Sequence, residues 1–405
     1  MLITISRDFN ANSMKDISSM SERVTMLEAI CEGSPREMGL AQGAAVRSKI
    51  RGAHAALAEL EAFRLQQPRW LPYSAYRWIA EQKAARFLAA PLARDFPAMK
   101  ERLLGIAEGA GISLNGVLLI NALEPLMSSL GGCTVCPGAC SAVAIRGHRS
   151  KNGEPIVARN FDYLPLVQPF YIMRKSKPSN GLRAVEFTTA PLAGAVDGMN
   201  EAGLCITYNY GFTTDQPKQP AAPISMAISL ALQHCSNVSQ AADFISSMPR
   251  WGGALLMLAD ADGEIASLEL SSTRHHLRRP GMGEDALYHT NAFASPRMQE
   301  VQIARDAVYT NSAPAPLRGR PVHRSSELRD QRFEQLLAAT DAFDADQLNA
   351  LMADHGPDNQ PSDHTLCVHG AYWFTTACLQ FFPRSRRIRV SYSTACQARF
   401  EEIEL

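Results

Sequence analysis

Hydrophobic and polar positions alternate with a period of two through much of the chain beyond its first third. The clearest strand-like segments are the apolar ones at 142–145 and 155–158, and a Lys-Asn-Gly turn at 151–153 lies between them. Two such segments joined by a turn of this composition are typical of a β-hairpin. The second segment ends in Arg-Asn-Phe-Asp, so the hairpin should bring a thiol, a guanidinium and a carboxylate to one end of two paired strands.

The first third of the chain has a helical pattern instead. A short strand is predicted at 27–33, after which Ser34 and Pro35 supply an N-cap and a first helical residue, so a helix is expected to about Arg51. Ala, Leu, Glu, Lys and Arg then recur at helical spacing from 55 to 109. Prolines should divide this region into several helices. The expected breaks lie near Pro68, Pro72, Pro91 and Pro97.

Two features of these helices have more than one interpretation. Gly39 and Gly43 are spaced by four, which either allows another backbone to approach closely or is merely tolerated. A further helix is predicted at 113–130, and it carries Asn121 and Glu124 on an otherwise apolar background. These two polar residues either support a site from behind or form an exposed face.

The remaining pattern groups helices and strands in blocks, which favours a layered α+β fold over repeated βαβ units. The predicted strands are 170–174, 183–189, a pair within 194–210, 254–260, 266–270, one ending at 288–291, 371–382 and 388–392. The predicted helices are 223–248, 326–340 and 344–354.

Composition narrows the class of ligand. Forty basic residues balance forty acidic ones, so no net field attracts nucleic acid or an anionic membrane, and a small, partly apolar ligand is expected. No stretch approaches about 18 consecutive apolar residues, and the N-terminus lacks a signal-peptide pattern. Nine cysteines in a chain of 405 residues are too few for a disulfide scaffold. A soluble, cytoplasmic protein without a membrane partner is therefore expected.

Cys140, at the start of the hairpin, is the candidate nucleophile for an amide or thioester carbonyl. It is also the third cysteine of a short run with Cys133 and Cys136. These three could be metal ligands, with His148 as the only nearby fourth ligand, or Cys133 and Cys136 could be a redox pair. A buried, inert Cys140 is a third interpretation.

A nucleophilic thiol with an ordinary pKa of about 8.5 needs a base or a positive neighbour. No histidine lies at an obvious triad position. If the peptide bond before Cys140 is cleaved, the new α-amine, with a pKa of about 7.7–8.0, is itself suited to proton transfer. Asp162 can accept a hydrogen bond from that amine, and Arg159 adds positive potential that favours the thiolate. A purely structural ion pair between Arg159 and Asp162 is the alternative.

Several ordered motifs resemble the N-terminal-nucleophile amide hydrolases of the penicillin acyltransferase and choloylglycine hydrolase group. They are the hairpin ending at 159–162, the segment GMNEAGLCITYN at 198–209, and Tyr-His-Thr-Asn at 288–291. The segment at 32–50 and the closing strands ending near Cys396 resemble the penicillin acyltransferase branch more closely. The resemblance covers most of the chain and implies a four-layer αββα sandwich of two antiparallel sheets between helical layers.

The resemblance also implies roles for individual residues. Cys140 matches the nucleophile. Asn291 matches a donor to the tetrahedral oxyanion, and Asn209 resembles a second donor in a segment one residue shorter than the related pattern. Arg329 resembles a late active-site arginine, for which Arg332 is a close competitor. The predicted site residues are Cys140, Arg159, Asp162, Asn209, Asn291 and Arg329.

These inferences predict a self-processing cysteine amidase or acyltransferase that acts on a small-molecule amide or acyl thioester without a cofactor or metal. Residues 1–26 should have little structure, 27–139 should form a helical light chain, and 140–405 a catalytic heavy chain. A homo-oligomer of such chain pairs is compatible with the sequence. Ala139 stands where Gly is expected before the nucleophile. The alternative function is a non-catalytic metal- or thiol-redox protein built on Cys133, Cys136 and Cys140.

Overall fold

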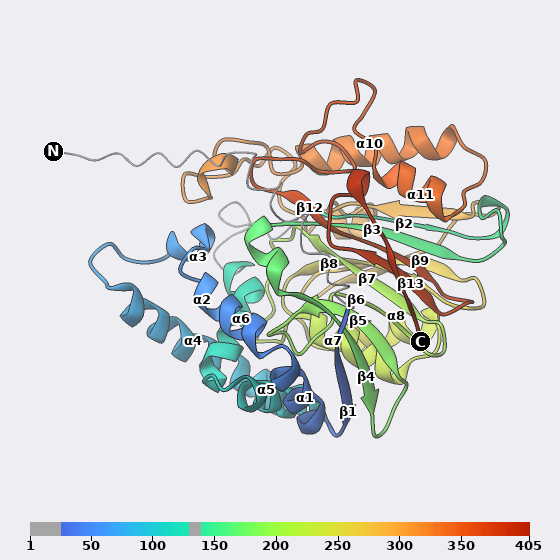
Figure 1. Ribbon diagram of the computed structural model, residues 1–405. Helices are drawn as coiled ribbons and strands as arrows, with labels where there is room; N and C mark the ends of the chain where they lie inside the picture. Colours follow the sequence, from blue (N-terminus) through green and yellow to red (C-terminus); the bar gives the residue numbers. More distant parts are fainter. Residues whose placement is uncertain (1–25, 129–138) are drawn as a thin grey trace.

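The computed structural model describes residues 26–128 and 139–405. The expectation for the first residues, and that for Cys133 and Cys136, therefore lie outside the described residues. The described chain forms two stacked β-sheets with helices on their outer faces (Figure 1).

The larger sheet has eight strands in the order β1-β4-β5-β6-β7-β8-β9-β10, and the smaller has six in the order β11-β2-β3-β12-β13-β14. All neighbours are antiparallel except β1 and β4, which run parallel. The expectation of two antiparallel sheets is thus wrong for one edge pair, because β1 comes from the helical leading segment and enters the sheet beside β4. The larger sheet contains β1 (Leu27–Gly33), β4 (Tyr171–Pro178), β5 (Ala184–Thr189), β6 (Asp197–Asn200), β7 (Cys205–Gly211), β8 (Gly253–Ala259), β9 (Ile265–Leu270) and β10 (His275–Arg278). The smaller contains β2 (Ser141–Ile145), β3 (Ile156–Tyr163), β11 (Ala286–His289), β12 (Phe374–Phe382), β13 (Arg387–Ser391) and β14 (Glu401–Glu404).

Helices complete the four layers. The pair α7 and α8 packs on the outer face of the larger sheet, α10 and α11 pack on that of the smaller one, and the two sheets face each other, which confirms the αββα sandwich (Figure 1). The leading helices gather at one side of the larger sheet. The helices are α1 (Pro35–Ala45), α2 (Arg47–Ala56), α3 (Glu61–Arg64), α4 (Tyr73–Arg94), α5 (Pro97–Ala110), α6 (Leu114–Ser128), α7 (Ile224–His234), α8 (Val238–Ser247), α9 (Pro296–Gln299), α10 (Arg324–Ala338) and α11 (Ala345–Met352).

The predicted hairpin is present as β2 and β3, with Ala142 opposite Arg159. Its connection is longer than the expected turn and includes a 3-10 helix, η3 (Gly147–Arg149). Both strands are buried almost throughout because they lie in the interior of the smaller sheet, between β11 and β12. The end of the hairpin that carries the candidate chemistry is therefore held on rigid elements.

The start of the leading helices also follows local signals. Ser34 and Glu37 form a capping box at the start of α1. The spacing of Gly39 and Gly43 serves close packing, since a methyl group on either glycine would clash with backbone of α5. Pro91, an expected break, instead lies inside α4, one turn before that helix ends.

One predicted helix is divided in the structure, and two strands were not predicted. The single helix expected at 223–248 is divided into α7 and α8, because Asn237 caps a new helix with its side chain. The edge strands β10 and β14 were missed because their residues are largely exposed and show no clean alternation. Among the described residues, no helix is both long and apolar enough to cross a membrane.

Candidate active site

Cys140 lies directly before β2 and is buried. Its Sγ is 3.9 Å from the backbone oxygen of Asp162, which also accepts a hydrogen bond from the backbone N–H of Ala139 at 3.1 Å. The chain entering the hairpin is thus held against the end of β3, and the peptide bond between Ala139 and Cys140 is positioned beside the predicted Arg-Asn-Phe-Asp motif.

Arg159 is the positive group nearest to the thiol. Its Nη2 lies 3.4 Å from the Sγ of Cys140, while Nη1 donates to Asp197 at 2.9 Å and Nε donates to Asn209 at 3.3 Å. The guanidinium also donates to the backbone oxygen of Tyr208. Because Nε, Nη1 and Nη2 of this planar group all have partners, the orientation of the guanidinium toward the sulfur is fixed.

Asp162 is fully buried next to this cluster. One of its carboxylate oxygens, Oδ1, accepts a hydrogen bond from the Thr375 hydroxyl at 2.5 Å. The other, Oδ2, is buried and has no hydrogen-bond partner among the described residues. A buried carboxylate oxygen without a partner is costly, so it marks a place where a donor is expected.

The structure separates the two competing arginines. Arg329 on α10 donates to the backbone oxygen of Cys140 at 2.6 Å, to the Ser141 hydroxyl at 2.8 Å and to Asn291 Oδ1 at 3.0 Å. Arg332, one turn later, instead makes two hydrogen bonds to Asp354, at 2.8 and 2.7 Å. Arg329 is therefore the one that lies against the candidate nucleophile.

The two candidate oxyanion donors lie on either side of this cluster. Asn291 follows β11, and its amide nitrogen makes one hydrogen bond, to the backbone oxygen of Tyr210 at 2.9 Å. Asn209 on β7 directs its amide nitrogen to two backbone oxygens, at 3.0 Å from Thr290 and 3.5 Å from His289. Asn291 thus keeps more donor capacity than Asn209.

Burial dominates the electrostatics of the uncut chain. It raises the pKa of the Cys140 thiol to about 11, although Arg159 opposes this. It also raises the pKa of Asp162 to about 7 against the opposing effects of Arg329 and the Thr375 hydroxyl, and that of Asp197 to about 6. The intact chain therefore keeps its thiol protonated at neutral pH.

A cavity of about 170 Å³ opens beside Cys140 and is lined mainly by apolar side chains. One wall comes from α2 and α6 of the leading segment, and the opposite wall from β3, β7 and a 3-10 helix, η4 (Pro165–Phe170). The leading helices are thus part of the pocket, and they stay necessary for its shape even if the chain is cut before Cys140.

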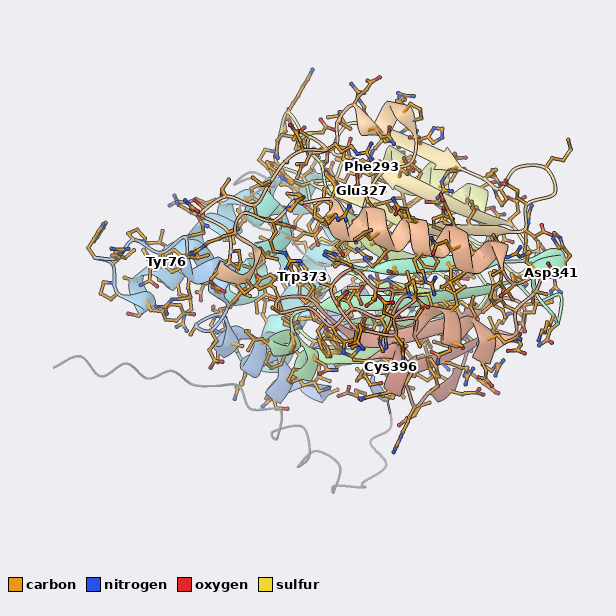
Figure 2. All side chains as sticks on the ribbon, turned by 90° about the horizontal axis from the view of Figure 1, so that it is seen from above. Tyr76, Phe293, Glu327, Asp341, Trp373 and Cys396 are labelled. Carbon is orange, nitrogen blue, oxygen red and sulfur yellow. The ribbon has the colours of Figure 1, made fainter. Side chains whose placement is uncertain are left out.

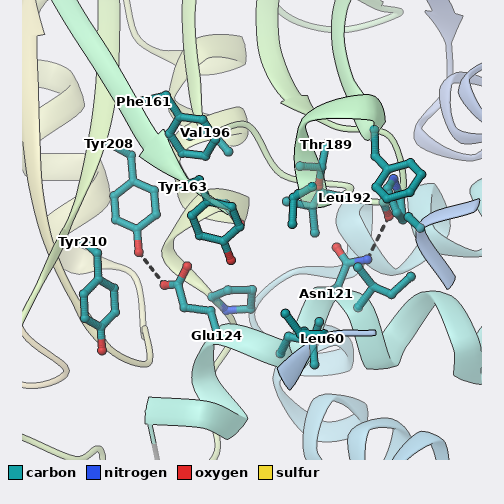
Figure 3. Close-up of a pocket in the computed structure, with 18 of the residues that line it drawn as sticks. Leu60, Asn121, Glu124, Phe161, Tyr163, Thr189, Leu192, Val196, Tyr208 and Tyr210 are labelled. Atoms are coloured by element: carbon teal, nitrogen blue, oxygen red, sulfur yellow. Dashed lines mark hydrogen bonds between the residues drawn. The ribbon is translucent and has the colours of Figure 1, made fainter. Parts of the chain in front are cut away.

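The cavity contains one acidic side chain, that of Glu124. Figure 3 shows it accepting a hydrogen bond from the Tyr208 hydroxyl, with Tyr163 and Tyr210 nearby. Burial raises the pKa of Glu124 to about 7. Asn121, one turn earlier, is buried and bonds to the backbone of Pro191 at 2.9 Å and of Ala193 at 3.1 Å. Neither residue belongs to an exposed face: Asn121 holds a pocket loop, and Glu124 faces the pocket.

Three residues of the site were not predicted. Asp197 holds Arg159, Thr375 holds Asp162, and the Ser141 hydroxyl accepts from Arg329. Asp197 immediately precedes the Gly-Met-Asn segment used in the sequence comparison, so it was within reach of motif reasoning. Thr375 was not, since a threonine in a strand has no distinguishing signal.

His289 on β11 and His148 in the hairpin connection make contacts away from Cys140. His289 is buried and pairs with Ser267 at 2.8 Å, and burial lowers its pKa well below the ordinary value. His148 pairs with Asp285 at 2.7 Å in the hairpin connection. Within 26–128 and 139–405, no hydrogen bond joins a histidine to Cys140.

Several solved structures are similar to part of the chain, with low sequence identity. A Caenorhabditis elegans N-acylethanolamine-hydrolyzing acid amidase ortholog is 12% identical over 60% of this chain and 93% of its own, with a TM-score of 0.41. A mutant of conjugated bile acid hydrolase from Clostridium perfringens is 13% identical over 66% and 92%, with a TM-score of 0.39. Penicillin V acylase from Agrobacterium tumefaciens is 15% identical over 66% and 86%, with a TM-score of 0.41. No curated protein matches the chain.

A family model is matched more directly. The model described as acyl-coenzyme A:6-aminopenicillanic acid acyl-transferase matches residues 148–390, which is more than half of the chain. The match begins after Cys140 and includes Arg159, Asp162, Asn291 and Arg329. It confirms the resemblance predicted from the motifs, and the family that it describes is one of acyltransferases. The chain belongs to the acyl-coenzyme A:6-aminopenicillanic acid acyl-transferase family.

Proposed function

We propose that the chain cleaves its own Ala139–Cys140 bond and then acts as an N-terminal-cysteine amidase or acyltransferase on a small-molecule amide or acyl thioester. The observation that carries this proposal is the buried Oδ2 of Asp162, which has no donor among the described residues and lies in the cluster around Cys140. Cleavage would create a donor in this cluster, the α-amine of Cys140.

The cleavage step is an acyl shift followed by hydrolysis. The Sγ of Cys140 attacks the carbonyl carbon of Ala139, the C–N bond breaks, and the thiol proton passes to the amide nitrogen, which becomes the α-amine. Water then hydrolyses the thioester and leaves a carboxylate on Ala139. The hydrogen bond from Arg329 to the Cys140 carbonyl oxygen, at 2.6 Å, supports this step because it fixes the peptide on the far side of the bond that breaks.

The catalytic cycle then uses the same atoms. The α-amine accepts the thiol proton, the thiolate attacks the acyl carbonyl of the substrate, and an N–H of Asn291 stabilises the oxyanion. The α-ammonium protonates the leaving amine, and a thioester on Cys140 remains. Water or a second amine, deprotonated by the α-amine, attacks that thioester and releases the product. Hydrolysis and acyl transfer differ only in this last nucleophile.

The pocket supports an apolar acyl group as the part of the substrate that is recognised. Its lining is mostly aliphatic and aromatic, and a cavity of about 170 Å³ suits a short chain or a single ring. Glu124 adds one polar contact at neutral pH, where its raised pKa keeps part of the population protonated and able to donate a hydrogen bond.

Intact-mass measurement under denaturing conditions tests the proposal. The wild type is expected as two chains with about one third and two thirds of the 44.3 kDa total, because the cut falls before Cys140. Cys140→Ala should remain one chain, and Cys235→Ser, a buried cysteine on the other side of the larger sheet, should be cut like the wild type. An uncut wild type with full amidase activity would contradict the α-amine mechanism.

A further inference from the structure

Four potential metal ligands meet in one place outside the substrate pocket. They are His355, Cys367, His369 and Cys396, and one ligating atom from each lies within 4.8 Å of those from the others. Cys367 and His369 are separated by one residue, but His355 and Cys396 lie farther away along the chain on either side, so local spacing did not reveal the cluster. The expectation of no metal rested on the run that ends at Cys140, which is a different part of the chain.

Two segments bring these side chains together. His355, Cys367 and His369 belong to the irregular segment 353–373 that follows α11, and Cys396 lies in a 3-10 helix, η6 (Ala395–Gln397), after β13. Cys367 is buried, while Cys396, labelled in Figure 2, is exposed. The cluster thus connects the long segment 353–373 to the C-terminal part of the smaller sheet.

The distances fit tetrahedral coordination. The Nε2 of His369 lies 3.3 Å from the Sγ of Cys367 and 3.5 Å from the Sγ of Cys396. Zinc binds sulfur at about 2.3 Å and nitrogen at about 2.0–2.1 Å, which places tetrahedral sulfur and nitrogen ligands about 3.5 Å apart. These two pairs of ligating atoms are therefore spaced as a bound zinc ion requires, and every other pair in the cluster lies within 4.8 Å.

One nitrogen of the cluster has no ordinary hydrogen-bond partner. The Nε2 of His355 is buried and has no hydrogen-bond partner in the described part of the chain. A buried imidazole nitrogen without a partner is unfavourable, and a metal ion would satisfy it. The Thr394 hydroxyl lies 3.3 Å from the Sγ of Cys396, where it can donate to a thiolate and support a ligand from behind.

We propose that His355, Cys367, His369 and Cys396 bind one zinc ion in a structural site. Two thiolates and two imidazoles are a donor set typical of tetrahedral zinc, and the two thiolates neutralise the charge of the ion. Because four protein ligands close the coordination shell, the ion has no open position for substrate or water. Its effect is to fix the segment 353–373 against η6.

The site is two hydrogen bonds away from the catalytic carboxylate. Val368, between two of the ligands, donates its backbone N–H to the Thr375 hydroxyl at 2.8 Å and accepts from the Thr375 N–H at 2.9 Å. That hydroxyl donates to Asp162 at 2.5 Å. Metal binding therefore also holds Asp162 in place. This consequence rests on the proposed function, whereas metal binding itself does not.

Metal content of the full chain tests the site. The protein, purified without chelator and without a histidine tag, is expected to contain about one zinc per chain by elemental analysis. Cys367→Ser and Cys396→Ser should each reduce this at least fivefold. Two matched controls, Cys235→Ser and His364→Gln, should keep it, since neither side chain belongs to the cluster.

A second measurement keeps the proposal testable if a variant fails to fold. Cobalt added to metal-depleted wild type should give a sulfur-to-cobalt charge-transfer band together with the visible absorption of tetrahedral cobalt, and zinc should displace both. A wild type with no metal and no such band would overturn the proposal. So would a Cys367–Cys396 disulfide in the native protein, or zinc that is lost in Cys133→Ser but kept in Cys367→Ser. Loss of zinc from Cys396→Ser with normal chain cleavage would support the site and remove only its link to Asp162.

Discussion

Two buried carboxylates in this molecule, Glu186 and Asp162, have opposite surroundings. Both oxygens of Glu186 accept hydrogen bonds, from Arg174 at 2.8 Å, from Ser176 at 2.5 Å and from Ser229. Although burial raises its pKa, Arg174 and Arg102 lower it to about 2. Asp162 has one oxygen without a described partner, and its pKa is raised to about 7.

The difference distinguishes Glu186, a charge that holds the structure together, from Asp162, a carboxylate with an oxygen left to bind another donor. Glu186 is saturated with donors, so it is an ion throughout the neutral range and joins β5, β4 and α7. Asp162 is incompletely paired among the described residues, and under the proposed function the missing donor is the α-amine that cleavage before Cys140 would create. The two carboxylates are therefore distinguished by the pairing of their own oxygens, which is complete for Glu186 and incomplete for Asp162 among the described residues.

The largest expected effect on stability comes from Glu186→Gln. It leaves Arg174 without its buried counter-ion, which should lower the free energy of unfolding by about 3–5 kcal/mol, while cleavage and activity per folded molecule stay unchanged. Urea unfolding measures the change. Glu201→Gln is the matched control, because its pair with Arg183 is at the surface and should cost about 1 kcal/mol or less. If Glu186→Gln lowered the free energy of unfolding by no more than Glu201→Gln does, Glu186 would not be the structural charge described above.

Asp162→Asn should instead impair cleavage and activity while leaving the folded structure intact. It preserves the shape of the side chain, so the fold should stay intact, but it removes the acceptor for the α-amine. Cleavage and turnover should fall by about 10²–10³. Time courses of chain cleavage and of amide hydrolysis measure this, with Asp260→Asn, a buried carboxyl in the turn after β8, as control. Normal cleavage in Asp162→Asn would remove Asp162 from the site.

The last prediction concerns how stability depends on pH. The contributions of Asp162 and Glu186 should change in opposite directions as pH rises. The pKa of Asp162 is raised to about 7 from 3.8, so its contribution to stability is present below about pH 4 and is lost as pH rises through 7. The pKa of Glu186 is lowered to about 2 from 4.5, so its contribution is present above about pH 4.5 and is lost as pH falls toward 2.

Unfolding of the uncut Cys140→Ala chain over a range of pH measures both effects. Adding Asp162→Asn should raise stability more at pH 8 than at pH 4, and adding Glu186→Gln should lower it more at pH 6 than at pH 3. Parallel pH dependence of the two double variants would show that the carboxylates do not differ in the way described.

Local sequence signals determined much of this fold. The capping box at Ser34, the apolar segments of the hairpin and the order of three motifs each depend on residues close together in the chain, so they were readable without the structure. The same holds for five of the six predicted site residues, which lie in or beside those motifs. Arg329 was harder to distinguish from Arg332. Both lie in the same mainly polar helical segment, and only the packing of α10 shows which of them contacts Cys140.

The sequence by itself therefore determined the elements, their layering and the region of the candidate nucleophile. Only the tertiary structure decided which atoms meet. Asp197 reaches Arg159, Thr375 reaches Asp162, and Glu124 faces the substrate pocket across distances along the chain that no periodicity encodes. The physical reason is that side-chain period and capping are properties of neighbouring residues. Buried hydrogen bonds and metal-ligand clusters depend instead on how separate sheets, helices and loops pack against one another.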